Sequence, residues 1–520
     1  MSTRGETAAP EGSCDLLVIG GGVNGVGIAR DAVGRGLKVI LCESRDLASA
    51  TSSASSKLIH GGLRYLEQYE FRLVREALAE REVLLGIAPH IVRPLRFVLP
   101  HNATLRPAWM IRIGLFLYDH LAKRSRLPGS HGVDLRHGAE GAPLKQELTK
   151  GFVYSDCAVD DSRLVVLNAM DAAARGAEIL TRTACTAARR EGALWHATLT
   201  GEDGQSRTIR ARALVNAAGP WVTDVLQHVL HSNSQDHLRL VQGSHIVVPR
   251  LYDGDHAYIL QNPDERIVFV IPYQGAYTLI GTTDVAYDGD PAVAAISPAE
   301  TTYLCLSVSR YFAKPVRPED VVWSYSGVRP LYDDAAQNTS PNNPSTVTRD
   351  YVFDLSGGID GTAPLLSVFG GKLTTYRRLA EHALEKLAPL LQAPTKGWTH
   401  AAPLPGGDLG GASITAFARD FAGRHPWLPA DLASRYVHSY GSLGEMVVGD
   451  ARSLAELGEH FGAGLYAREV EYLVTHEWAR SPDDILSRRT KLLLEADTAM
   501  REKLAGWLAR YGRSEARAVS

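Results

Sequence analysis

The sequence predicts an α/β fold followed by a helical C-terminal domain. An apolar run, Leu16–Ile19, ends in three glycines, and a segment rich in small residues, Val23–Val33, leads to a second apolar run, Leu37–Leu41. This order and these lengths are typical of a βαβ unit, whose strands are buried on both faces of a parallel sheet. After about residue 400 the apolar residues recur at helical spacing instead.

Further elements follow from short apolar runs separated by polar turn residues. Strands are expected at Glu178–Thr181, Ala213–Asn216, His245–Val248, Ile267–Ile271 and Thr278–Ile280. Helices of the C-terminal domain are expected at Ala451–Leu457, Ala467–Val474, Pro482–Leu494 and Thr498–Tyr511. A loop rich in Asn, Ser and Pro, Gln337–Ser345, divides two strand regions, and Ala401–Gly411 is expected to be a linker.

The composition is that of a large globular protein. The chain has 520 residues, 45% of them hydrophobic and 22% charged, which is ordinary for folded domains. Lys and Arg number 55 and Asp and Glu 58, so the net charge is -3 and we expect no nucleic-acid partner. The N-terminal extension, residues 1–12, is polar, and we expect neither a secretory signal nor a membrane-spanning helix.

The cysteines are scattered rather than paired. They are Cys14, Cys42, Cys157, Cys185 and Cys305, with no CxxC pair and no Cys/His cluster at zinc spacing. We therefore expect no metal, and we interpret the odd count as free, mostly buried thiols in a reducing compartment.

A glycine motif lies between the first strand and its helix. Gly20, Gly22 and Gly25 form G-x-G-x-x-G, and Glu43 ends the second strand. Such glycines allow a tight turn, a close approach of the backbone to a pyrophosphate and close helix packing, while the acid accepts hydrogen bonds from a ribose. The helix N-terminus adds unpaired N–H groups and partial positive charge. The motif in this context predicts a dinucleotide site; the alternative is a glycine-rich turn without a ligand.

The next segment favours FAD over NAD. Thr51–Lys57 is dense in hydroxyl groups and leads into His60-Gly61-Gly62-Leu63-Arg64-Tyr65. Hydroxyls and bare backbone bind phosphates, and paired glycines let a flat ring lie against the chain. A solvated Ser-rich loop is the alternative, but the position directly after Glu43 favours a ligand.

Long motifs resemble one family. They are DLLVIGGGVNGVGIARDAVGRGL, ATSSASSKLIHGGLRYLEQYEFRLVREALAERE, GSHIVVPR, IGTTD, YSGVRPL and SVFGGKLTTYR, and together they resemble the FAD-dependent, respiratory glycerol-3-phosphate dehydrogenases of bacteria. The resemblance begins near Asp15 and runs into the C-terminal region. It implies oxidation of glycerol 3-phosphate to dihydroxyacetone phosphate, with hydride transfer to non-covalent FAD and electrons passed to ubiquinone or menaquinone.

The resemblance also implies a domain plan. An FAD-binding, Rossmann-like domain of the glutathione-reductase and D-amino-acid-oxidase type would comprise residues 13–85, 150–235 and 325–395. An interleaved α+β capping domain would comprise 86–149 and 236–324, and the helical domain 400–520. The cofactor-binding residues would be Gly20, Gly22, Asn24, Gly25, Glu43, Thr51, Ser52, Ser53, Ser56, His60, Gly61, Gly62, Ala218, Gly219, Gly371, Lys372, Leu373 and Thr374.

Oxidation of a secondary alcohol needs a base, cations for the phosphate and a cation near the flavin carbonyls. His245, in Gly243-Ser244-His245, is our candidate base, with His60 and Lys372 as rivals. Arg329, in Gly327-Val328-Arg329-Pro330, is assigned to phosphate binding and transition-state stabilisation, since arginine binds phosphate in a bidentate way. The further candidates are Arg64, Tyr65 and Arg349 for the substrate and Lys372 for catalysis, while Asp284 is assigned to orienting a neighbour.

One apolar segment, Pro107–Tyr118, is flanked by Arg106, Lys123, Arg124 and Arg126 and is interrupted by Arg112. It is either an interfacial membrane segment or a core helix. The family's role with quinones favours the first, so we expect a peripheral protein on the cytoplasmic side of the inner membrane, and the resemblance suggests a homodimer. A soluble oxidase that reduces oxygen and a non-catalytic FAD-binding scaffold remain alternative functions.

Overall fold

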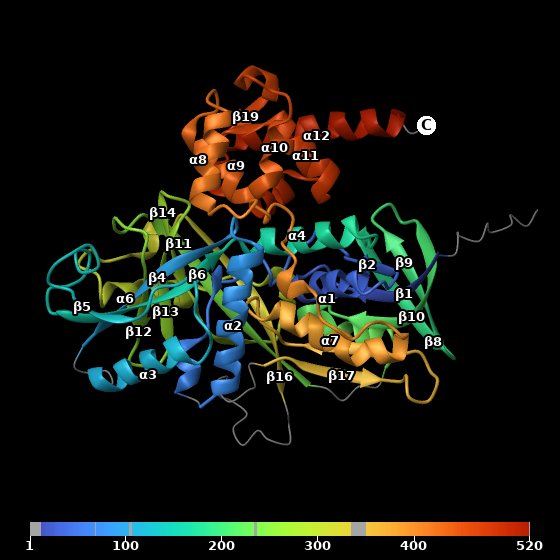
Figure 1. Ribbon diagram of the computed structural model, residues 1–520, viewed down its shortest axis with the longest axis horizontal. Helices are drawn as coiled ribbons and strands as arrows, with labels where there is room; N and C mark the ends of the chain where they lie inside the picture. Colours follow the sequence, from blue (N-terminus) through green and yellow to red (C-terminus); the bar gives the residue numbers. More distant parts are fainter. Residues whose placement is uncertain (1–11, 68, 103–106, 233–236, 334–349, 519–520) are drawn as a thin grey trace, which may run out of the picture.

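Two sheets lie side by side, and the helical C-terminal domain packs above their junction (Figure 1). The computed structural model describes residues 12–67, 69–102, 107–232, 237–333 and 350–518. The expected loop Gln337–Ser345, Arg106 and Arg349, and all but the last residue of the N-terminal extension, lie outside these ranges.

The first sheet has the parallel core that the βαβ unit predicts. Five parallel strands run in the order β18 (Leu365–Phe369), β10 (Ser206–Asn216), β1 (Gly12–Ile19), β2 (Val39–Cys42) and β7 (Glu178–Leu180). An edge strand, β17 (Val352–Ser356), and the hairpin β8 (Thr183–Glu191) and β9 (Leu194–Gly201) add antiparallel pairs. Loops at the carboxyl ends of these parallel strands are where such sheets bind ligands.

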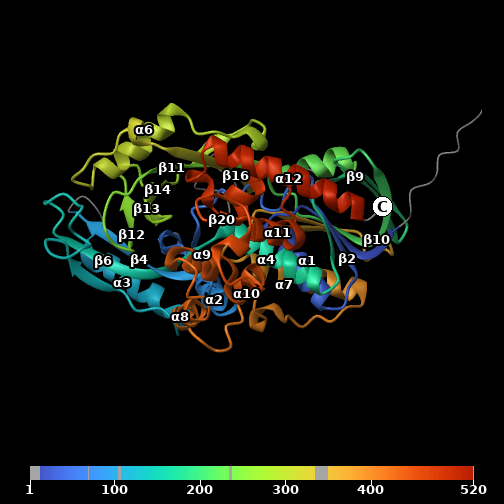
Figure 2. The same cartoon turned by 90° about the horizontal axis from the view of Figure 1, so that it is seen from above.

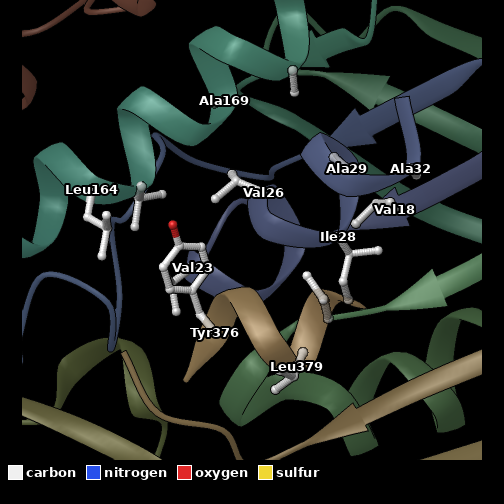
Figure 3. Close-up of a cluster of buried hydrophobic side chains, with 14 of the residues drawn as sticks. Val18, Val23, Val26, Ile28, Ala29, Ala32, Leu164, Ala169, Tyr376 and Leu379 are labelled. Carbon is white, nitrogen blue, oxygen red and sulfur yellow. The ribbon is translucent and has the colours of Figure 1, made fainter. Parts of the chain in front are cut away.

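Three helices cover one face of this sheet. They are α1 (Val23–Gly34), α4 (Asp161–Ala174) and α7 (Tyr376–Leu391). Leu16 and Val18 of β1 belong to the core beneath these helices, whereas the alternating Leu17 and Ile19 belong to the core on the other face. Figure 3 shows Val26 and Ile28 of α1 between side chains of α4 and α7.

The second sheet is mostly antiparallel. Its strands run in the order β15 (Val285–Tyr287), β11 (His237–Pro249), β14 (Tyr277–Gly281), β13 (Ile267–Tyr273), β12 (Ala257–Gln261), β4 (Val92–His101), β6 (Lys150–Val159) and β3 (Leu58–Ile59). In addition, β16 (Trp323–Asp333) pairs with β11, and β5 (His131–Asp134) pairs with β6. Helix α6 (Pro298–Ser309) packs on one face, and α2 (Phe71–Ile87) and α3 (Ala108–His120) pack on the other.

Sheet membership bears on the expected domain division. Strands β3, β6 and most of β16 fall inside the ranges assigned to the cofactor domain, yet all three pair in the second sheet. Backbone hydrogen bonds thus join the two parts at three places, so β3, β6 and β16 belong structurally with the capping sheet. The boundaries themselves stay a prediction.

The C-terminal domain has its own apolar core. Its helices are α8 (Ile414–Arg424), α9 (Ala430–Tyr440), α10 (Gly444–Val448), α11 (Ala467–Glu477) and α12 (Thr498–Ala518), beside a small hairpin of β19 (His460–Gly462) and β20 (Leu465–Tyr466). Seen from above in Figure 2, these helices lie over α4 and α1. A short helix, α5 (Val222–Asp224), completes the fold within the described residues.

The expected helices of this domain are confirmed in part. Those over Ala467–Val474 and Thr498–Tyr511 match α11 and α12. The helix expected at Ala451–Leu457 is wrong in type, because this range holds only a 3-10 turn at Leu454–Leu457. The helix expected at Pro482–Leu494 is confirmed in part: residues 482–489 are helical, mostly as the π-helix η10 (Asp484–Arg489), and a 3-10 turn follows, η11 (Leu492–Leu494). Buried ion pairs of Arg488 and Arg489 with Asp46 anchor the η10 turn, a long-range constraint that periodicity does not register.

Candidate functional site

A cavity of about 280 Å³ lies between the two sheets. Its wall gathers four separate groups of residues: the start of α1, the hydroxyl-rich segment after β2, the loop after β18, and one end of the second sheet. From the sequence-predicted site the lining includes Gly22, Asn24, Thr51, Ser52, Ser56, His60, Gly61, Tyr65, Gly219, His245, Arg329, Gly371, Lys372, Leu373 and Thr374.

The glycine motif forms the tight turn that its spacing predicts. Gly20 has a φ of 113°, in a region that favours glycine. A Cβ atom added at Gly25 would lie 1.9 Å from the carbonyl oxygen of Gly20, so α1 can approach β1 only without a side chain there. Glu43 closes the turn, since its carboxylate accepts from the N–H groups of Gly21 at 2.7 Å and Arg45 at 2.8 Å.

The N-terminus of α1 points its positive end into the cavity. No side chain caps the helix at Gly22 and no acidic residue lies in its first turn. Val23 N–H donates to Ser52 Oγ at 3.0 Å, and the Asn24 amide donates to the Gly370 carbonyl at 3.1 Å while its Oδ1 is buried without a partner among the described residues. This end therefore suits an anionic phosphate group.

The hydroxyl-rich segment does not act as one unit. Ser52 turns to α1 and Ser56 Oγ lies 2.8 Å from His245 Nε2, while Thr51 donates to the Val328 carbonyl at 2.7 Å and so joins the segment to β16. Ser53 Oγ donates to the Ala50 carbonyl of its own turn. The segment thus contributes both residues that line the cavity and internal supports.

A buried polar chain supports the paired glycines at the far end of the cavity. Gly61 N–H donates to Tyr118 Oη at 2.8 Å, and Tyr118 donates to Asp156 at 2.7 Å. Arg81 donates to the same carboxylate at 2.6 Å, so the chain is charge-balanced. Burial lowers the pKa of His60 beside this turn, with the nearby Lys372 charge as a weaker cause.

Lys372 and Tyr65 contact each other in the wall of the cavity. The Lys372 ammonium lies 4.0 Å from the centre of the Tyr65 ring, a cation–π contact. Tyr65 sits on the 3-10 turn η1 (Leu63–Leu66), and Lys372 follows β18. Two elements far apart in sequence thus bring a cation and an aromatic ring to the same wall.

His245 lies at the end of the cavity on β11. It is 3% exposed, and its ring stacks on Tyr325 at 4.9 Å between centroids with an interplanar angle of 13°. A Cβ at Gly281, directly opposite on β14, would lie 2.0 Å from His245 Cδ2, so only glycine admits the ring. Burial lowers the pKa of His245 to about 3, with further lowering by the charges of Lys57 and Arg329.

Arg329 enters the same end from β16. Its guanidinium donates to Asp284 Oδ1 at 2.8 Å, and its side chain is 35% exposed. Asp284 therefore does orient a neighbour, as the sequence suggested, and both residues line the cavity. Thr282, which the sequence analysis did not single out, lines the wall beside them.

Some predicted residues lie elsewhere. Gly20, Gly25, Glu43 and Gly62 shape the turns behind the wall, Ala218 N–H binds the Asn216 side chain, and Ser53 faces another hollow. Arg64 lies on η1 in a separate apolar groove rather than in the main cavity. Arg349 is outside the described residues.

Three residues near His245 were not predicted from the sequence: Tyr325, which stacks on the ring, and Ser55 and Asp161 behind it. Ser55 and Lys57 stand inside the hydroxyl-rich segment, which was a usable signal. Nothing in the sequence indicated that the buried Asp161, about a hundred residues further on, accepts from both of them.

This geometry fits a flavin nucleotide. The buried, partnerless oxygen of Asn24, the uncapped helix end and the glycines that leave room at the wall suit the phosphates and a flat ring. Fold and site together define an FAD-dependent oxidoreductase. Residues 15–377 match the family described as FAD dependent oxidoreductase, and 398–512 match the C-terminal domain of alpha-glycerophosphate oxidase. The chain belongs to the FAD dependent oxidoreductase family.

Curated relatives cover nearly the whole chain. A glycerol-3-phosphate dehydrogenase of Pseudomonas aeruginosa is 57% identical over 95% of this chain and 94% of its own length. The aerobic glycerol-3-phosphate dehydrogenase of Escherichia coli is 54% identical over 96% and 97%. A D-erythritol 1-phosphate dehydrogenase of Brucella abortus is also 54% identical, over 96% and 98%.

Solved structures agree on the fold. The glycerol-3-phosphate dehydrogenase of Bacillus halodurans, complexed with FAD, has a TM-score of 0.76 and 28% identity, and the match covers 96% of this chain and 91% of that one. The L-alpha-glycerophosphate oxidase of Mycoplasma pneumoniae has a TM-score of 0.59 at 17% identity, which shows a shared fold.

Proposed function

We propose that the protein oxidises glycerol 3-phosphate to dihydroxyacetone phosphate and passes the electrons to a membrane quinone. The observation that carries the proposal is the meeting of a neutral histidine and an arginine, His245 and Arg329, at the substrate end of the cavity. The names and high identity of the relatives from Pseudomonas aeruginosa and Escherichia coli support the same substrate.

His245 is the proposed base. Because burial lowers the pKa of His245 to about 3, its ring is neutral at working pH. Its Nε2 is engaged by Ser56, whereas Nδ1 is buried without a partner among the described residues. The imidazole lines the cavity, so a neutral ring nitrogen would accept the substrate hydroxyl proton there.

Arg329 is the proposed phosphate ligand. It stays charged in any environment and offers a planar pair of donors. Asp284 holds the guanidinium at the cavity wall before substrate arrives. FAD, when bound, supplies the hydride acceptor. Lys372 lines the same cavity, and its positive charge would stabilise the negative charge that reduction creates.

The outer face of α3 supports the membrane role. Only Leu115 and Tyr118 of this helix are buried, whereas Trp109 is 63% and Phe116 is 56% exposed. An exposed apolar helix face flanked by Arg112 and Lys123 suits an interface with anionic lipid. Within the described residues, no helix combines the length and apolar character needed to cross a bilayer.

A second cavity lies beside α3. This apolar groove of about 270 Å³ is lined by residues of η1, α3 and the second sheet, among them Leu63, Leu66, Met110 and Ile259. The turn η1 separates it from the main cavity, since Tyr65 lines that cavity and its neighbours line the groove. Such a groove suits an apolar electron acceptor drawn from the membrane. The proposed acceptor is ubiquinone or menaquinone. We also propose that the protein is a homodimer on the cytoplasmic face of the membrane.

The membrane proposal is tested by vesicle flotation. The double variant W109S/F116S should shift from vesicles containing anionic lipid to the soluble fraction, because two aromatic side chains leave the acyl boundary. The matched control is V293S/L306S, which removes two apolar side chains that are 72% and 55% exposed elsewhere. Activity with a soluble dye should persist in both. Equal flotation of both double variants would remove α3 from the membrane contact.

The reaction is tested by anaerobic titration of the purified yellow protein. Glycerol 3-phosphate should bleach the flavin absorbance, and acid precipitation should release FAD into the supernatant. A flavin that glycerol 3-phosphate leaves oxidised would contradict the proposal and favour a scaffold. Rapid oxygen uptake with peroxide formation would instead indicate an oxidase.

A second candidate substrate is D-erythritol 1-phosphate. The relative from Brucella abortus with that activity in its name is as similar in sequence as the relative from Escherichia coli. Comparing kcat/KM for the two phosphates separates the candidates, and a higher value for the four-carbon substrate would replace glycerol 3-phosphate.

A further inference from the structure

Behind His245 a single buried carboxylate collects four donors. Asp161, the first residue of α4, is fully buried. Its Oδ2 accepts from Ser55 Oγ at 2.8 Å and Lys57 Nζ at 2.9 Å, and its Oδ1 accepts from Ser162 N–H at 2.9 Å and Lys491 Nζ at 3.1 Å. Both oxygens are thus satisfied, by two distant parts of the chain and by the neighbouring Ser162.

These contacts fix the residues that touch His245. Ser56 lies between the two side chains anchored to the carboxylate, and its hydroxyl is 2.8 Å from His245 Nε2. The carbonyl of Ser55 accepts from Tyr325 Oη at 2.8 Å, and the Tyr325 ring is the one that stacks on His245. The ammonium of Lys57 lies 4.9 Å from the centroid of the same Tyr325 ring. Two chains of contacts therefore connect Asp161 with the imidazole, one through Ser56 and one through Tyr325.

The segment needs this support. Lys57 has a φ of 57°, a left-handed backbone conformation that is unfavourable for a non-glycine residue. Its Nζ also donates to the Ser53 carbonyl at 2.9 Å, which bends the segment back on itself. Without the Asp161 carboxylate, the Ser55 hydroxyl and the Lys57 ammonium would lose an acceptor. The segment would then relax away from this geometry.

Lys491 connects the C-terminal domain with Asp161. It lies between the turns η10 and η11, about 330 residues after its partner in the chain. Its ammonium also lies 3.5 Å from Asp160 Oδ1, so two lysines and two aspartates balance within the cluster. The helical domain thus supplies one of the charges around Asp161, although none of its described residues lines the main cavity.

We propose that Asp161 is a positioning residue for His245 and that the C-terminal domain acts on the site through Lys491. Neither residue lines the main cavity. Their effect is to hold Ser56 and Tyr325 against the imidazole, so that one nitrogen of His245 faces the substrate. The proposal rests on the proposed role of His245 as the base.

The test is stopped-flow flavin reduction by glycerol 3-phosphate in the holoenzyme. Asp161→Asn should lower the limiting reduction rate by roughly tenfold to a hundredfold, since small displacements of a catalytic group have effects of this size. The substrate concentration at half-saturation should change much less, because Arg329 is untouched. Lys491→Met should lower the rate less, and Lys491→Arg should restore it.

Glu477→Gln is the matched control. Glu477, in the C-terminal domain, forms an equally buried ion pair with Arg163 of α4, and the variant breaks this pair. The pair does not contact the segment that bears Ser56. The variant should lower Tm but leave the limiting rate within about a factor of two. In protein with ¹³C-labelled histidine, the His245 resonances should change in Asp161→Asn and not in this control.

The outcomes are distinct. A folded, FAD-loaded Asp161→Asn protein that reduces flavin at the wild-type rate overturns the proposal, as does an equal loss of rate in Glu477→Gln. If Asp161→Asn does not fold, Lys491→Met decides: an unchanged rate overturns the proposal. If His245→Asn itself reduces flavin normally, the base assignment fails instead.

Discussion

The two ends of the main cavity are built in different ways. The nucleotide end comes mainly from one short stretch of chain, in which Gly20, Gly25, Glu43 and Ser52 meet through a single βαβ unit. One distant contact, from Asn24 to the Gly370 carbonyl, is added to it. The substrate end is assembled from β11, β16, the turn after β14 and the loop after β18, with supports from α4 and the C-terminal domain. A local motif therefore suffices for the first end, whereas the second depends on the register of a sheet.

The largest expected effect is at the local end. Gly25→Ala would place a Cβ 1.9 Å from the Gly20 carbonyl oxygen, and neither backbone can move without separating α1 from β1. We expect loss of FAD and of several kcal/mol of stability, as for severe overpacking. Flavin content and Tm measure this. Gly423→Ala, on exposed α8 with no atom near the added Cβ, is the control and should retain both; a yellow, stable Gly25→Ala protein would contradict the account.

The next effect probes the assembled end. His245→Asn should slow flavin reduction by about 10²–10⁴, the usual contribution of a positioned base. FAD should remain bound, because the nucleotide end is separate. Stopped-flow spectroscopy measures the rate, with the exposed His228→Asn as control. Wild-type reduction by the His245 variant would move the role to His60 or Lys372.

A smaller effect is expected for the phosphate contact. Arg329→Ala should lower kcat/KM for glycerol 3-phosphate by about tenfold to a hundredfold, since a charge-assisted hydrogen bond contributes about 1.5–3 kcal/mol. Steady-state kinetics with a dye acceptor measure this, and the exposed Arg317→Ala is the control. Unchanged kinetics would remove Arg329 from the site.

The same contrast explains what the sequence could predict. The strands and helix of the first βαβ unit, with its glycine turn, follow from local periodicity and were confirmed within a few residues. His245 and Arg329 were found only through their motifs, because their meeting depends on the pairing of Val241 with Arg329 and of His245 with Tyr325. A shift of one residue in the register of either strand would turn its side chain to the other face of the sheet and separate the two residues.

Long-range contacts account for what could not be predicted. The partners of Asp161 come from residues 55, 57 and 491, and no spacing rule links them. Arg64 stands beside Tyr65 in the same motif, yet the 3-10 turn directs the two side chains to different cavities. Adjacent residues in a tight turn point in different directions, so a motif alone assigned Arg64 to the wrong hollow.

The smallest expected effect concerns a buried histidine outside the cavity. His90 is fully buried, and neither ring nitrogen has a partner among the described residues. Burial lowers its pKa to about 3, with smaller contributions from the charges of Arg163 and His438. His245 shares this low pKa but is also the proposed base, so His90 isolates the cost to stability alone.

The sign follows from linkage. A histidine held neutral in the folded state but protonated in the unfolded chain below about pH 6.5 destabilises the fold as the pH falls, until the folded pKa is reached. Between pH 7 and pH 5 the loss from His90 should be about 2 kcal/mol. The Tm of His90→Leu should therefore fall less than the wild-type Tm between pH 7 and pH 5. At pH 8 the difference in Tm between the two proteins reflects packing alone. Because His245 is present in both proteins, its contribution cancels, and parallel curves from pH 8 to pH 5 would show that His90 is charged in the folded protein.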